Sequence, residues 1–176
     1  MKKMLMKAMA VLTVLAISVS LTACGDDNKN DEPTVPESGI TRVVVDYKVE
    51  LSEDYFNLWD IEIAYTNAGG QTVTEKIDQD WNLEMDLLAQ DEIPSEYKLT
   101  VTGKPKTPVP ELDAEKLYHL NSLVGAVVSG YDNNGNRIAV DGNPIQIDLA
   151  TKGVHLTELV TKDRKIASKT ATIKLK

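Results

Sequence analysis

From residue 41 onward, apolar and polar residues alternate in short runs. In the run 41–51 the apolar residues stand at every second position, and charged residues fill most positions between them. Successive side chains of a β-strand point to opposite faces of a sheet, so this pattern predicts a half-buried strand. The other runs with a strand-like pattern are 59–65, 72–77, 81–87, 97–101, 117–131, 137–140, 145–149 and 171–175.

Turn-forming residues separate these runs. Asn67-Ala68-Gly69-Gly70 and Asp132-Asn133-Asn134-Gly135-Asn136 are hairpin signals, and Asp141-Gly142-Asn143-Pro144 predicts a further turn. The two hairpin sequences resemble each other only locally, which indicates shared turn chemistry and no internal repeat. Three prolines between 104 and 113 predict a crossover loop, because proline has no amide hydrogen for a ladder.

The strand count and the regular spacing of turns predict an all-β fold. About eight or nine short strands favour an antiparallel β-sandwich, immunoglobulin-like or related, with a small closed barrel as the runner-up. The stretch 154–162 is compatible with one short helix or with a strand. In 117–131, the glycines at 125 and 130 predict a central strand with a bulge or a close backbone approach.

The first 23 residues have the organisation of an export signal. Three lysines lie before an apolar stretch, 8–21, which is too short for a membrane-spanning helix of about 20 residues. Leu21-Thr22-Ala23-Cys24 then resembles the lipobox of bacterial lipoproteins. The resemblance implies a diacylglyceryl thioether on Cys24, cleavage before it, and usually acylation of the new amino group. An ordinary secretory signal is the alternative.

The segment 24–39 is acidic and polar at its start and carries prolines and glycine further on, so we expect a flexible tether. Its beginning is similar to the acidic export signal that follows the lipid cysteine in surface lipoproteins of Bacteroidetes; a solvated linker is the alternative. The resemblance implies a surface-exposed, lipid-anchored outer-membrane protein, with the periplasmic face as the other location. Residues 40–176 then form one β-sandwich domain.

Charge and cysteine content exclude several functions. The chain has 19 basic and 27 acidic residues, a net charge of −8. Removal of residues 1–23 takes away three lysines and no acid, which leaves 16 basic residues, 27 acidic residues and a net charge of −11. Nucleic acids and anionic lipid surfaces recruit basic clusters, so neither is an expected partner. Lipidation would consume the only thiol and exclude disulfides and cysteine catalysis.

No catalytic group is assigned. Ser95 and Lys98 match the S-x-x-K pattern of penicillin-recognising serine enzymes, but a strand pattern follows Pro94 where that chemistry needs a helical turn. A Ser-His-Asp triad would lack the nucleophile elbow G-x-S-x-G. The chain is therefore predicted not to be an enzyme.

No metal or other cofactor is predicted either. The two histidines, His119 and His155, would need a carboxylate beside them to bind zinc, and a structural role is the preferred interpretation for each. Asp132, Asn134 and Asn136 resemble the start of a calcium loop without its later ligands. The other candidate calcium site consists of the acidic residues Glu53, Asp54 and Asp60.

The cluster Tyr55, Phe56 and Trp59 breaks the period-two pattern and lies in a loop or a single helical turn. Core packing is the simplest interpretation, but these rings are also the candidate ligand-binding residues. The function predicted is a non-enzymatic, lipid-anchored interaction module whose partner is a glycan, another envelope protein or a host molecule. Two alternatives remain: a glycan-binding accessory lipoprotein of an outer-membrane uptake system, and an adhesin or pilus-like structural subunit.

Overall fold

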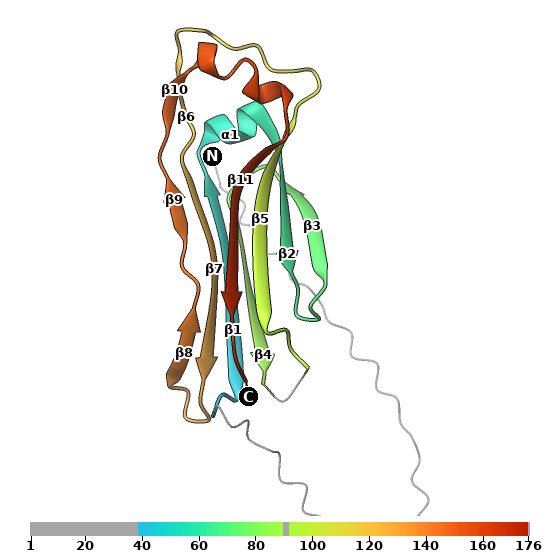
Figure 1. Cartoon of the computed structure of the whole chain (residues 1–176), viewed down its shortest axis with the longest axis vertical. Helices are drawn as coiled ribbons and strands as arrows, with labels where there is room; N and C mark the ends of the chain where they lie inside the picture. Colours follow the sequence, from blue (N-terminus) through green and yellow to red (C-terminus); the bar gives the residue numbers. More distant parts are fainter. Residues whose placement is uncertain (1–38, 90–91, 176) are drawn as a thin grey trace, which may run out of the picture. The chain divides into compact units, whose positions relative to one another are not determined.

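A computed structural model describes residues 39–89 and 92–175 (Figure 1). These residues are mostly strand, with one short α-helix and two single turns of 3₁₀-helix, Gly153–His155 and Leu159–Thr161. The strands and the helix are β1 Arg42–Leu51, α1 Glu53–Leu58, β2 Trp59–Thr66, β3 Thr72–Ile77, β4 Trp81–Leu88, β5 Glu96–Pro105, β6 Leu117–His119, β7 Ser122–Tyr131, β8 Arg137–Asp141, β9 Ile145–Ile147, β10 Ala150–Lys152 and β11 Arg164–Thr172.

Two antiparallel sheets form the fold, and they pack face to face around one core. In the β1 sheet the order is β4-β1-β7-β8, and β9 also pairs with β7. In the β2 sheet the order is β11-β5-β2-β3, and β6 and β10 form a separate short ladder. No ladder of the described residues joins the two main sheets, so the predicted sandwich is confirmed and the barrel is not formed.

The strand order is that of a related sandwich and differs from the immunoglobulin arrangement. In an immunoglobulin domain the first two strands lie in the same sheet. Here β1 and β2 lie in opposite sheets, and the short helix α1 carries the chain from one to the other.

The core consists of the inward-facing positions of both sheets. Val43, Val45 and Val49 of β1 are fully buried, as are Ile63 of β2 and Val101 of β5. The alternate residues of each strand face solvent, which is the arrangement that the period-two pattern predicts. The sequence pattern therefore located the core correctly.

The two hairpin turns have the same hydrogen bonds, which confirms the shared turn chemistry. The side chain of Asn67 accepts bonds from the amides of Gly69 and Gln71, and Asp132 accepts them from Asn134 and Asn136. Each turn contains a glycine at positive φ, where a residue with a Cβ would be strained.

The Asp141-Gly142-Asn143-Pro144 stretch was predicted as a turn, and this prediction is wrong. β8 and β9 follow one another along the same side of β7, so the stretch is an interruption within one sheet edge (Figure 1). Gly142 has φ +84° and lies so close to β7 that an added Cβ would be 2.1 Å from the carbonyl oxygen of Ala126. The chain passes over β7 here because glycine lets the two backbones approach closely.

Several other boundaries also differ from the prediction. The run 117–131 is divided into β6 and β7 at Asn121, whose backbone amide and carbonyl both bond to Ser52. The stretch 154–162 lies across the two 3₁₀ turns and forms neither a strand nor an α-helix. β11 already begins at Arg164, well before the predicted run 171–175, because the residues from Arg164 onward pair with β5.

Candidate functional site

Tyr55, Phe56 and Trp59 do not form a ligand-binding platform, which corrects the prediction made for them. Tyr55 and Trp59 are 2% and 1% exposed, and their ring centroids are 5.9 Å apart within the core. Phe56 is partly buried against the same core. α1 turns its aromatic side chains inward because it closes one end of the sandwich, and this burial raises the pKa of Tyr55.

The other six aromatic residues provide no stacking platform either. Besides Phe56, only Trp81 and Tyr131 are partly exposed. Trp81 packs against Tyr47 and Tyr65, with ring centroids 6.4 and 5.2 Å away. A glycan-binding surface needs at least two rings free on one plane, and the structure does not bring two such rings together.

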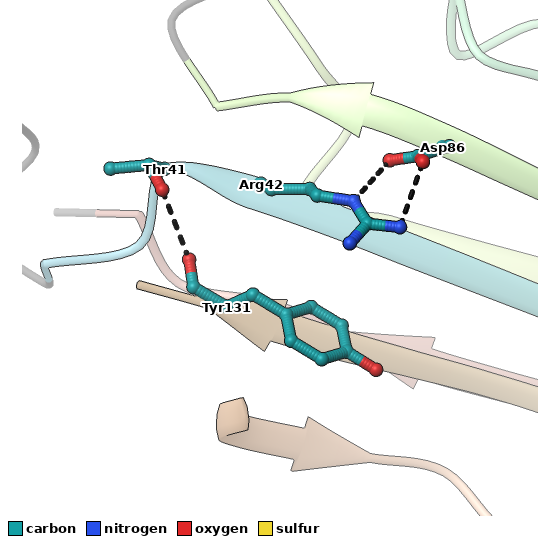
Figure 2. A network of polar contacts seen from close by, with 4 residues as sticks. All are labelled: Thr41, Arg42, Asp86 and Tyr131. Atoms are coloured by element: carbon teal, nitrogen blue, oxygen red, sulfur yellow. Dashed lines mark hydrogen bonds and ion pairs between the residues drawn. The ribbon is translucent and has the colours of Figure 1, made fainter. Parts of the chain in front are cut away.

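Tyr131 belongs to a polar network on the outer face of the β1 sheet (Figure 2). The guanidinium of Arg42 lies 5.2 Å from the centroid of the Tyr131 ring and donates two hydrogen bonds, of 2.7 and 2.8 Å, to the carboxylate of Asp86. Hydrogen bonding between these groups raises the pKa of Arg42 and lowers that of Asp86. The groups satisfy one another and occupy one face of the tyrosine ring.

Several of the candidate enzymatic and calcium-binding residues accept hydrogen bonds from backbone amides of the fold. Lys98 lies in extended β5, and the Ser95 carbonyl accepts a hydrogen bond from the amide of Ile173, so the pair is not on a helical turn. The carboxylate of Asp132 accepts hydrogen bonds from the backbone amides of Asn134 and Asn136 within its own turn. The carboxylate of Asp54 accepts a 2.6 Å hydrogen bond from the backbone amide of His119.

Metal ligands do not gather in the part of the chain that the structure describes. Both His119 and His155 are exposed and lie on different elements. Within residues 39–89 and 92–175, no group of three or more histidine, cysteine, aspartate and glutamate residues could hold a metal ion. Cys24, the predicted lipidation site, lies outside the described residues.

One edge of the β1 sheet carries an unusual row of exposed aliphatic side chains, which we call the β8–β9 margin. Its members are 37–58% exposed and lie on β8, on β9 and just after β9. They are Ile138, Val140, Ile145, Ile147 and Leu149. β8 and β9 each pair with β7 on one side, and their opposite edge pairs with no described strand.

The other three edges of the two main sheets carry charge. β3 contains Glu75 and Lys76, β4 contains Glu84 and Asp86, and β11 contains two lysines and an arginine. Charged residues on an edge strand oppose pairing with another chain. In the β8–β9 margin, charge is confined to the ends of the apolar runs, so this edge lacks the protection that charge gives the other three.

A shallow cleft of about 400 Å³ adjoins the margin on the outer face of the β1 sheet. Glu50, Leu123 and Gln146 stand side by side across β1, β7 and β9, because the two ladders place them in register. Asp148 completes the acidic side, and its carboxylate accepts a 2.9 Å hydrogen bond from the side-chain amide Nε2 of Gln146. The cleft and the margin share β9 and therefore form one continuous candidate site.

The chain matches no protein-family model, no curated protein and no solved structure. The site therefore has to be interpreted from its own geometry.

Sequence reasoning missed the margin because alternation at 145–149 indicates a strand but does not tell which strand lies at an edge. The signal that could have located it is the low charge of residues 138–149 compared with the other edge strands, β3, β4 and β11. One finding concerns membrane association. Among the described helices, none is long and apolar enough to cross a membrane.

Proposed function

We propose that this protein is a lipid-anchored module of the bacterial cell envelope that binds another macromolecule and has no enzymatic activity. The observation that carries the proposal is Leu21-Thr22-Ala23-Cys24 after a basic and apolar segment. Two or three acyl chains on Cys24, at about 0.8 kcal/mol per buried methylene, would hold the domain at a membrane.

The described domain supports a binding role. It combines a well-packed sandwich with one sheet edge that exposes aliphatic side chains, and exposed apolar patches on stable domains mark contact surfaces. The candidate catalytic residues Ser95 and Lys98 and the two histidines take structural or exposed positions. The location that fits best is the outer membrane, with the acidic run after Cys24 directing the domain to the cell surface.

The anchor is tested by metabolic labelling with palmitate. The Cys24→Ala variant should lose the label and the membrane association, because the chain has no second thiol to carry the lipid. Asn28→Ala, four residues away in the proposed tether, is the matched control and should stay labelled. Undiminished labelling of Cys24→Ala would refute the lipobox assignment.

Surface display is tested separately by protease treatment of intact cells. We expect the natural protein to be degraded and the Asp26→Asn, Asp27→Asn double variant to be protected, because the variant lacks the acidic signal while keeping Cys24. Equal protection of both proteins would place the domain on the periplasmic face.

A further inference from the structure

We infer that the β8–β9 margin binds an extended, neutral or basic segment of a partner protein, which adds to the β1 sheet as a further strand. The inference rests on the proposed function in assuming a binding module, and it adds the mode of binding and the chemistry of the partner.

The first argument is the combination of a free sheet edge with aliphatic side chains. An edge strand exposes backbone amides and carbonyls that can pair with another strand. The margin adds Ile138 and Val140 beside one half of this edge and Ile145 and Ile147 beside the other. An added strand would satisfy the backbone groups and cover these side chains at the same time.

The second argument concerns the two faces of this edge. Ile145 and Ile147 are in register with Val124 and Ser122 of β7, on the core side of the sheet, whereas Val140 is in register with Ser129 on the outer side. Apolar side chains therefore lie on both sides of the free edge. An added strand points its side chains to both faces of the sheet and can contact both groups, whereas a flat surface that approaches one face cannot.

The third argument is charge. Asp141 and Asp148 lie at the ends of the two runs and Arg137 begins the first run, which leaves one net negative charge at the margin; none of the three forms an ion pair with a described residue. The carboxylate of Asp141 accepts hydrogen bonds from the amide and hydroxyl of Thr172, which lowers its pKa and keeps it ionised. Together with a net charge of −11 after cleavage, these carboxylates disfavour an acidic segment and a second copy of the chain.

The last described strand, β11, is not available as the donor. β11 is paired with β5 from Arg164 to Thr172, so the chain uses this strand in its own β2 sheet. This favours a role as acceptor of a partner's strand. It disfavours the pilus-like arrangement in which the last strand of each subunit is given to its neighbour.

The experiment uses the mature lipoprotein in phosphatidylcholine nanodiscs and two blocked peptides of eight residues. Both peptides alternate valine and threonine in their centre; one has lysine at each end and the other has glutamate. The lysine peptide should bind at least tenfold more tightly than the glutamate peptide. Empty nanodiscs provide the background for both.

Two variants locate the binding. Val140→Lys should weaken binding of the lysine peptide at least tenfold, because it places a charge in the apolar row at a position that is 58% exposed. Thr74→Lys introduces the same residue on the exposed edge strand β3 and should leave binding unchanged. Equal binding by both variants would overturn the proposal.

Hydrogen exchange provides a readout that does not depend on any substitution. Strand addition should slow exchange of amides in β8 and β9, while amides of β3 keep their rate. Binding without this protection would overturn the strand-addition mode. A nanodisc-bound protein that forms dimers broken by Val140→Lys would instead identify a second copy as the occupant and also overturn the proposal. None of these outcomes changes the palmitate result, so failure here is distinct from failure of the anchor.

Discussion

Gly142 and Gly135 form a natural pair for testing whether the interruption between β8 and β9 lies as close to β7 as described. Both have positive φ, +84° and +80°, so alanine at either position would be strained by about 1–2 kcal/mol. They differ in their surroundings. An added Cβ at Gly142 would lie 2.1 Å from the carbonyl oxygen of Ala126 and 2.8 Å from Cβ of Ala171, whereas at Gly135 no atom lies within 4 Å.

The expected loss of stability follows from this difference. Gly135→Ala should lower the free energy of unfolding by the strain alone, about 1–2 kcal/mol. In Gly142→Ala the backbone of β7 cannot move aside as a flexible side chain could, and overpacking adds about 1–3 kcal/mol. The effect of alanine on the unfolded chain is the same in both variants and cancels in the comparison.

Urea unfolding followed by tryptophan fluorescence measures both values, since Trp59 is buried and Trp81 is partly buried in the native domain. Equal slopes of the unfolding free energy against urea concentration would show that the variants unfold in the same manner. If the two losses agree within about 0.5 kcal/mol, the close approach of Gly142 to β7 is refuted. The continuous β8–β9 edge would then lose its structural basis.

Three further predictions concern the core. Tyr97→Phe should leave the free energy of unfolding unchanged or raise it, because the buried Tyr97 hydroxyl has no hydrogen-bond partner among the described residues. Tyr47→Phe removes a 2.8 Å bond to the carbonyl of Thr66 and should cost about 1 kcal/mol, so equal effects in urea titrations would contradict this prediction. Burial raises the pKa of Tyr97 to about 12, above the unfolded value of about 10. The neutral phenol is therefore favoured by folding, and stability should be complete below about pH 10 and fall toward pH 12, less steeply in Tyr97→Phe; melting temperatures that stay constant from pH 8 to pH 12 would exclude this linkage. Gly103→Ala would place a Cβ 2.9 Å from the Trp59 ring and should cost about 1–3 kcal/mol by thermal or urea unfolding, and an unchanged stability would show that the ring moves freely.

The sequence by itself determined the fold class, most of the strands and the composition of the core. Period-two alternation is a local property, since each strand of a half-buried sheet must place its apolar residues on one face regardless of its neighbours. The hairpin turns at Asn67 and Asp132 were equally predictable, because an Asx side chain bonds to amides two and four residues further on. Lipidation of Cys24 and the export signal stay predictions from sequence.

Tertiary structure decided which strands are neighbours, which edges are free and which aromatic rings are buried. Tyr55 and Trp59 have the same local sequence whether they face a ligand or the core, and only the position of α1 at the end of the sandwich places them inside. Gly142 lies in a stretch with the sequence of a turn, yet β8 and β9 both pair with β7 and the stretch is an interruption within one sheet edge. The β8–β9 margin likewise depends on strand order, because exposure of Val140 and Ile147 follows from the lack of a described strand beside them, and such pairing is set by contacts distant in sequence.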